Sequence, residues 1–567
     1  ARADYYRAEA DKTSRALQDS LWNPQQGVWG EYRDLMGLGR LHPYPALWTV
    51  YHAIDAEAGT AAQRLSATRY VDDCIPHIPI VAAAGEGAEP TVVGQQLSTS
   101  CWQPYGWSIN NVAFAESMNM ALAYWQAGRP DDGYRLFRSN ILDGMYLGQS
   151  PGNVGQISHY DVARAECYRD FGDPVGVASR ALVEGLMGVV PERLQHRIVV
   201  RPGFPSHWDH ATLATPDVRL SYTRHGRRAT YRVTLSDTFT ADTLVLRLPG
   251  QHDRKTLTRG RSEFRFRVRT SRRNSSADLL TPSPADTLRP LLPAGQQSAA
   301  FTAVDTTALE PVAIPYNDSL TNLFTSRYLS PRPDRTTLQI PTNGIGEWCH
   351  PVTEFAIDDS ALRADTLLVT PLGVPFRTCP KGDNVLFATR WDNFPTRVSV
   401  PLTGCATHLY LLLAGTTNAM QSHIANGVVR VRYADGPADS LLLVTPYTWC
   451  PIEQDYYDDG LAFDLRGCRP WRLMLRDGRV SRILSATAAA AVHAQQYTAA
   501  TPVTLDTNTT GHFGNTLPGG AAILLDIPLD GRRPLATLEV ECLSNDILIG
   551  LLAATLQRNR GVTELRM

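Results

Sequence analysis

Lysine is nearly absent from this chain of 567 residues, occurring only at positions 12, 255 and 381, and arginine supplies the rest of the positive charge. The formal net charge is −2, and the arginines are spread along the sequence without forming a basic run. A nucleic-acid-binding segment needs concentrated positive charge. We therefore expect no nucleic-acid partner and interpret the arginine usage as a compositional habit, not as a patch.

Long apolar runs and paired cysteines are also missing. No run approaches the roughly 20 apolar residues that cross a bilayer, so we expect no membrane span. The nine cysteines are scattered without a Cys-x-x-Cys pair, which disfavours a zinc site. Their odd number in a long chain does not indicate a disulfide scaffold, and the pairing of one or two disulfides stays open.

Several catalytic motifs are absent: phosphate loops, dinucleotide-binding glycine patterns, Gly-x-Ser-x-Gly elbows and His-Glu-x-x-His sites. Their absence excludes most nucleotide enzymes and the familiar serine hydrolases. Acidic turns at 358–359 and 455–459 could contact calcium, but such turns are far commoner than calcium sites. We expect neither a metal nor another cofactor.

The chain changes its hydrophobic period near Arg197. Before this point a 3.6-residue period predicts helices, and after it an alternating period predicts strands. The expected domains are helical hairpins over 1–190, a β-sandwich over 191–270, a Pro- and Ser-rich linker over 271–299, and one or two jelly-roll-like modules over 300–567. Helices are expected at 2–21, 44–58, 110–127, 130–146 and 174–188, with a weaker candidate near 160–169.

The most informative stretch is 102–126, a loop rich in aromatic and amide side chains that runs into an apolar helix. Trp102, Trp107, Asn110 and Asn111 suit a sugar, because rings cover its C–H face and amides bind its hydroxyls. Glu116 lies inside the helix, where a carboxyl is costly unless it is paired, hydrogen-bonded or chemically used. A core helix with one satisfied glutamate and a packed aromatic loop explains the same pattern.

Other titratable groups surround this stretch in the sequence. Glu31 lies in the loop 27–34, and 158–173 is dense in charge and includes Tyr160, Arg169 and Asp170. Asp173 precedes a proline and is expected to cap a helix. His77 lies between prolines, either as a structural residue or as a substrate contact.

Residues 182–194, followed by the Pro-rich segment 198–208, resemble the six-hairpin glycosidase superfamily, as do the blocks 107–111, 121–130 and 151–155. The resemblance covers about residues 1–225 and is strongest to an uncharacterised branch from bacterial polysaccharide-degrading proteins. It implies a multidomain fold, α then β, with the C-terminal half of an (α/α)6 toroid followed by antiparallel β-sandwich domains. Since about six helices are expected where a toroid has twelve, the missing N-terminal half would belong to the parent protein or to another chain.

The resemblance also implies a function. It implies a secreted or periplasmic glycoside hydrolase that cleaves a polysaccharide or oligosaccharide between two carboxyl groups, usually with inversion. Glu116 would be the acid, Asp170 the base, and Glu31 the reserve for either role; the remaining substrate contacts would be His77, Tyr160 and Arg169. Two alternatives stay open: a polysaccharide lyase using His159, Tyr160, Arg164 and Asn110, or a non-catalytic carbohydrate-binding fragment.

Overall fold

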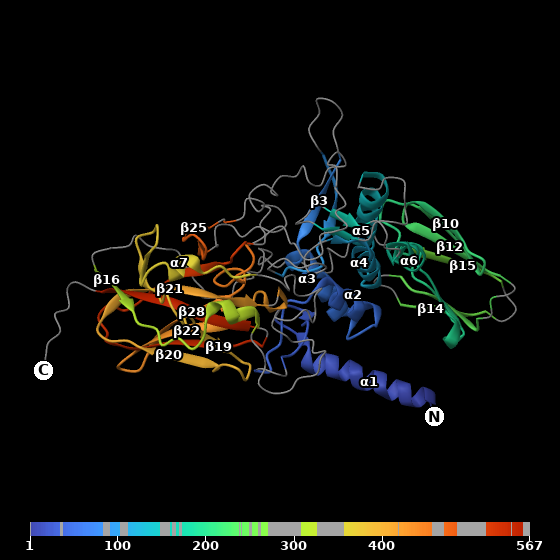
Figure 1. Cartoon of the computed structure of the whole chain (residues 1–567). Helices are drawn as coiled ribbons and strands as arrows, with labels where there is room; N and C mark the ends of the chain where they lie inside the picture. The colour runs from blue at the N-terminus through green and yellow to red at the C-terminus, as the bar shows by residue number, and fades with distance from the viewer. Residues whose placement is uncertain are drawn as a thin grey trace, which may run out of the picture.

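The computed structural model describes residues 2–34, 38–82, 91–102, 112–147, 159–161, 166–168, 173–236, 239, 241–248, 252–258, 262–269, 308–325, 356–417, 419–455, 470–482, 484, 517–545 and 547–558. We divide these residues into an N-terminal region (2–188), a middle β unit (189–269) and a C-terminal β unit (309–558). The N-terminal region lies between the two β units (Figure 1).

The helices of the N-terminal region are organised around one buried helix. They are α1 (Arg2–Ser20), α2 (Leu47–Asp55), α3 (Ala61–Cys74), α4 (Phe114–Gln126), α5 (Pro130–Ile141) and α6 (Asp173–Arg180), with π-helical turns η1 (Leu142–Leu147) and η2 (Ala181–Leu186) continuing α5 and α6. Helix α4 is buried on nearly every side and contacts α2, α5, α6 and η2. Helix α1 has no buried residue and projects away from the rest (Figure 1).

Short antiparallel strands interrupt these helices. They are β1 (Trp22–Asn23), β2 (Val28–Trp29), β3 (His77–Ala82), β4 (Thr91–Leu97), β5 (Val112–Ala113), β6 (His159–Asp161) and β7 (Glu166–Tyr168). They form three small sheets, β1–β2, β3–β4 and β5–β6–β7. The weak helix expected near 160–169 is therefore wrong, since β6 and β7 pair with each other in this interval.

The middle β unit packs two four-stranded sheets against each other. Its strands are β8 (Val189–Glu192), β9 (Arg197–Val200), β10 (His210–Ala214), β11 (Val218–His225), β12 (Arg228–Leu235), β13 (Thr243–Leu246), β14 (Arg254–Leu257) and β15 (Glu263–Arg269), with the 3-10 turn η3 (Arg193–Gln195). One sheet has the order β10-β11-β12-β15 and the other β14-β13-β9-β8. Alternating residues from both sheets fill a shared apolar cluster, as expected for strands with one buried face.

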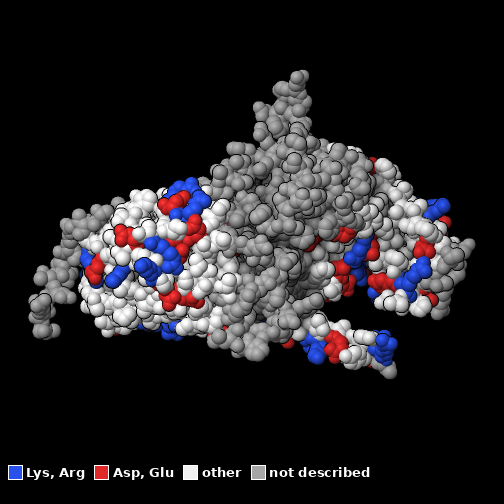
Figure 2. Space-filling view, in the orientation of Figure 1, with Lys and Arg blue, Asp and Glu red and all other residues white. Residues whose placement is uncertain are grey.

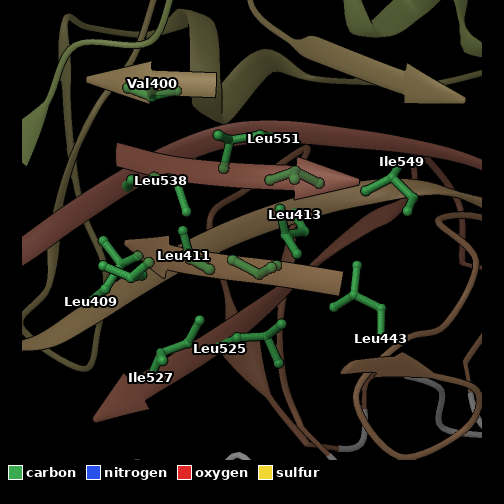
Figure 3. Packing of buried hydrophobic residues seen from close by; sticks show 14 of the residues in the cluster. Val400, Leu409, Leu411, Leu413, Leu443, Leu525, Ile527, Leu538, Ile549 and Leu551 are labelled. Carbon is green, nitrogen blue, oxygen red and sulfur yellow. The ribbon is translucent and has the colours of Figure 1, made fainter. Parts of the chain in front are cut away.

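The C-terminal β unit is also built from two main sheets. Its elements are β16 (Leu309–Val312), η6 (Leu320–Thr325), α7 (Ser360–Arg363), β17 (Leu367–Val369), β18 (Pro375–Arg377), β19 (Leu386–Thr389), β20 (Arg397–Pro401), β21 (Ala406–Thr417), η7 (Ala419–Gln421), β22 (Ala425–Tyr433), β23 (Ala438–Val444), β24 (Trp471–Met474), β25 (Val480–Ser481), β26 (Ala521–Pro528), β27 (Leu535–Cys542) and β28 (Ile547–Arg558). The long strands β21 and β28 pair in a seven-stranded sheet, and a four-stranded sheet β20-β27-β22-β23 faces it. Figure 3 shows their apolar side chains meeting, among them Leu411, Leu413, Leu538 and Leu551. Basic and acidic side chains are interspersed over the visible surface of this unit (Figure 2).

The expected fold class, half of an (α/α)6 toroid followed by antiparallel β-sandwich domains, is wrong. More of the described residues lie in strands than in helices, and three small sheets interrupt the helices that the toroid requires. The β part also departs from the expectation, because β9 and β13 pair in parallel and β19 branches from the seven-stranded sheet. The 3.6-residue period predicts most of the helices in this region, but it carries no information on whether helices close into a ring.

Candidate active site

The first turn of α4 carries a carboxyl group in an unusual environment. Glu116 is half-buried, and its Oε2 atom is enclosed without a hydrogen-bond partner among the described residues. Burial, and then the negative charges of Asp173 and Glu31, raise the pKa of Glu116 to about 8, while a hydrogen-bonding interaction with Tyr51 opposes this shift. The carboxyl is thus mainly protonated at neutral pH.

Tyr51 joins α2 to this carboxyl. Its side chain is 7% exposed, and burial together with the neighbouring charge of Glu116 raises the pKa of its phenol. The side chain of Asn119, one turn further along α4, also interacts with the Tyr51 hydroxyl. Because a phenol with a raised pKa remains a neutral donor, Tyr51 can hold the Glu116 carboxyl without adding charge.

The side chain of Glu31 lies against the start of α2, where three donors bind its carboxylate. Its carboxylate accepts hydrogen bonds from the Ala46 amide at 2.9 Å, the Trp48 indole at 2.8 Å and the Thr49 hydroxyl at 2.7 Å. Burial raises the pKa of Glu31, and these three donors oppose the increase. A carboxylate placed over helix-terminal donors stabilises the helix end, so Glu31 positions α2 and lends negative charge to the Glu116 site.

Asp173 is the second carboxyl of the site. It is exposed at the first position of α6, and partial burial raises its pKa. Among the charged neighbours of Glu116, Asp173 has the larger influence on the Glu116 pKa. The sequence favoured a capping role for Asp173 over a catalytic one, because neither periodicity nor motif indicates that α4 and α6 adjoin. In the structure these helices contact each other directly.

The structure brings together only part of the predicted site. Glu31 and Glu116 influence each other electrostatically. Trp107, Asn110, Asn111, Arg169 and Asp170 lie outside the described residues, as do Arg164 and the side chains of His159 and Tyr160.

Trp102 does not present a ring to solvent, contrary to the prediction that it would stack on a sugar. Its side chain is 0% exposed, and its indole donates a hydrogen bond to the Tyr44 carbonyl at 2.8 Å. Trp48 packs edge-on against it, with ring centroids 5.6 Å apart. The pattern of rings and amides does not distinguish a packed aromatic loop from a sugar-binding surface, and Trp102 itself is a buried core residue.

His77 lines a separate pocket of about 260 Å³ between β3, β4 and α5. Its Nδ1 lies 2.8 Å from the Ile75 carbonyl, which can only accept, so this nitrogen carries the proton. Burial lowers the pKa of His77, which keeps the ring neutral and leaves Nε2 as an acceptor. Asp72 and Asp132 also line the pocket, where Arg129 bridges the two carboxylates at 2.6 and 2.7 Å.

Sequence reasoning also missed an acid in the N-terminal region whose pKa is raised by burial. Asp143 lies in the π-helical turn η1, and burial raises its pKa to about 6. The Gln96 side-chain amide donates to it at 3.2 Å. Its neighbour Gly144 packs on Phe114 at the start of α4. No motif marks Asp143 in the sequence, because its burial depends on the contact between α5 and β4.

Within the described residues, no group of three His, Cys, Asp or Glu side chains could hold a metal ion, and no helix is both long and apolar enough to cross a membrane. No family model matches the chain, and no curated protein is significantly similar to it.

Proposed function

We propose that this chain belongs to a glycoside hydrolase and that Glu116 is the general acid that protonates the leaving oxygen. The observation that carries the proposal is the Glu116 carboxyl itself, whose pKa is raised to about 8 and whose Oε2 has no partner among the described residues. A glycosidase acid has to hold its proton at neutral pH, and burial is the usual way of achieving this. When Glu116 is protonated, an O–H at this oxygen has no acceptor among the described residues, so it can donate to a substrate oxygen that reaches the start of α4.

Asp173 is our candidate for the second carboxyl. It is exposed, whereas Glu116 is half-buried, so its ionised form is better hydrated and a water molecule can reach it. Two carboxyl groups in contrasting environments supply the acid and the base that glycoside hydrolysis requires. Glu31 then acts as a positioning residue, because its oxygens are occupied by donors of α2. Asp170, the base expected from the sequence, remains a prediction outside the described residues.

The carbohydrate class of the substrate rests on the sequence around this acid. The loop that precedes α4 contains Trp107, Asn110 and Asn111, a combination of ring and amides that suits a sugar. The polysaccharide or oligosaccharide would approach the start of α4, so that its leaving oxygen lies next to Glu116.

The test incubates the protein with a panel of plant and bacterial polysaccharides and measures hydrolysis by the release of reducing ends. Glu116→Gln and Asp173→Asn should each lower the rate by about 10²–10⁴-fold, the usual contribution of a general acid or base. Activity should fall as the pH rises through about 8, where Glu116 loses its proton.

Glu453→Gln is the matched control. Glu453 is also a buried glutamate with an unpartnered Oε2 and a pKa raised by burial to about 7, but it lies in the C-terminal β unit. This variant should retain activity. Full activity of Glu116→Gln would overturn the proposal, and products that absorb in the ultraviolet would assign a lyase instead.

A further inference from the structure

One face of the middle β unit concentrates arginine. In the sheet β10-β11-β12-β15, alternate residues point inward to the apolar cluster, and the residues between them are on the outer face. Among the side chains that the structure describes, the outer face carries five arginines and one acidic residue: Arg219, Arg228, Arg232, Arg265, Arg267 and Glu263. The sequence-based interpretation that arginine is not gathered into a patch is therefore wrong for this sheet, where pairing of three strands assembles the patch.

The arrangement leaves most of this charge uncompensated. Arg232 and Arg265 are directly opposite each other on neighbouring strands, and like charges in this position are destabilising. Arg232 forms an ion pair with Glu263 at 3.2 Å. For the other four arginines of the face, no ion pair is found within the described part of the chain. The arginines of this face therefore repel one another, and this repulsion does not contribute to folding. Locally unfavourable charge of this kind is typical of a surface that binds a charged partner.

Hydroxyl groups lie between the arginines. Ser221 is opposite Arg232, Thr230 is opposite Arg267, and Thr223 completes the row on β11. No Phe, Tyr or Trp occupies an outer position on the described residues of these four strands, since their aromatic side chains belong to the buried cluster. The backbone positions that carry these guanidinium and hydroxyl groups are about 6–7 Å apart along each strand and about 5 Å apart between neighbouring strands.

We propose that the outer face of β11, β12 and β15 binds an acidic polysaccharide whose charge comes from carboxylates. Guanidinium groups bind carboxylates through two parallel hydrogen bonds, and the serine and threonine hydroxyls are suited to the sugar hydroxyls between them. Single-stranded nucleic acid carries similar charge, but it is held by stacking of bases on aromatic side chains, which this face does not provide. The polysaccharide would lie across the strands and contact Arg232, Arg265 and Arg267.

Binding of oligogalacturonate to the whole chain tests this, with calorimetry or a fluorescent label as the readout. Affinity should fall with added salt, since the contact is between charges at an exposed surface. Arg265→Gln together with Arg267→Gln should weaken binding at least about tenfold, because each variant side chain loses a charge-assisted hydrogen bond to the polysaccharide.

The matched control changes two arginines of the C-terminal β unit. Arg476 and Arg479 are exposed, so Arg476→Gln with Arg479→Gln alters the net charge equally and should leave affinity unchanged. Carboxyl-reduced, neutral oligogalacturonate should not bind. Glu116→Gln should bind as well as the parent, because this proposal does not depend on hydrolysis.

Three outcomes would overturn the assignment: no binding of oligogalacturonate, equal losses in both double variants, or tighter binding of an oligothymidylate of matched charge. The last result would assign the face to nucleic acid. Each of these outcomes leaves the role of Glu116 untouched, so failure here is distinguishable from failure of the proposed hydrolysis.

Discussion

The Nε2 atom of His423 lies 2.7 Å from the carbonyl oxygen of Cys101, and this contact joins the C-terminal β unit to the segment that follows β4. Because a carbonyl only accepts, His423 donates through Nε2, and its Nδ1 lies 3.4 Å from the Tyr447 hydroxyl. His42, stacked on Tyr32, lies at the same junction. Two buried imidazoles thus connect the region that carries Glu116 to the β unit.

These imidazoles predict that the junction is sensitive to acid. Burial lowers the pKa of His423 to about 4, and burial with the nearby His423 lowers the pKa of His42 to about 3. Both values are below the unfolded value of about 6.5, so protons bind first to the unfolded chain. The contribution of these two imidazoles to stability should be constant above about pH 6.5 and decrease as the pH falls toward 3, by about 1.4 kcal/mol per pH unit for each imidazole.

The check is the free energy of unfolding of His423→Asn at pH 7 and pH 5. Asparagine tolerates the positive φ of 62° at this position and does not titrate, so the variant should lose less stability between the two pH values than the parent. His225→Asn, at an exposed histidine, is the control and should follow the parent. An unchanged pH dependence in His423→Asn would contradict the prediction.

The hydrogen bonds of Arg40 predict that a substitution at this residue uncouples the unfolding of the N-terminal region from that of the C-terminal β unit. Its guanidinium donates to the Ala425 carbonyl at 3.0 Å, the Leu543 carbonyl at 2.7 Å and the Ser544 hydroxyl at 2.5 Å, all in the C-terminal β unit. Arg40→Met removes the guanidinium donor of the Leu543 carbonyl and one of two donors of the Ala425 carbonyl, which keeps the Ser544 hydroxyl, and this loss should cost on the order of 2 kcal/mol. Calorimetry should show the N-terminal region and the β unit unfolding at more widely separated temperatures.

Arg33→Met is the matched control for Arg40→Met. Arg33 also donates to backbone carbonyls, those of Ser20 and Gly39, but both lie in its own region. Its loss should destabilise that region without separating the transitions. Identical calorimetric traces for the two variants would show that Arg40 does not couple the units.

The close packing of Gly185 against the Trp125 ring predicts that this position does not accept a larger side chain. A Cβ at this position would lie 2.1 Å from the indole Cε3, and Gly203 and Gly133 approach the same ring. Gly185→Ala should therefore destabilise the protein by about 1–3 kcal/mol, the usual cost of overpacking. Gly176→Ala, in α6 with no atom within 4 Å of a new Cβ, should instead stabilise it by roughly 0.5–1 kcal/mol. Denaturant titrations of both variants give the comparison, and equal effects would contradict it.

Hydrophobic periodicity in the sequence predicts many of the helices and strands, because it shows which face of a segment is buried. Residues 397–401 alternate between exposed and buried positions, as the alternating period after Arg197 predicts for strands. Helix α3 was missed although Thr60 and Gln63 form a capping box at its start, a signal that the apolar period of this segment does not reinforce. Strands β6 and β7 were missed because their pairing with β5 depends on distant residues.

The candidate site was predictable only in part for the same reason. The sequence identified Glu116 as a costly carboxyl in an apolar helix. It gave no indication that Asp173 raises the Glu116 pKa, since that effect requires α4 and α6 to meet. The arginine face arises in a similar way, from the register of β11, β12 and β15.

The last prediction separates catalysis from stability at Glu116. Its folded pKa of about 8 is above the ordinary value of 4.5, so the folded state holds the proton more tightly than the unfolded chain. Below pH 4.5 this carboxyl is protonated in both states, and its own contribution to stability is at its full value. As the pH rises from 4.5 to 8 the unfolded chain ionises first, and stability falls by up to about 1.4 kcal/mol per pH unit.

Glu116→Gln cannot ionise and escapes this loss, so it should be more stable than the parent at pH 7 and nearly equal to it at pH 4.5. Glu453→Gln should behave alike, since burial raises the pKa of Glu453 to about 7. The two variants differ in activity: only Glu116→Gln should be inactive, as expected where a destabilising group is retained for function. Unfolding titrations at both pH values measure the stabilities, and a loss of stability at pH 7 in Glu116→Gln would show that the ionised carboxylate is stabilised in the fold and is not an acid held ready to donate.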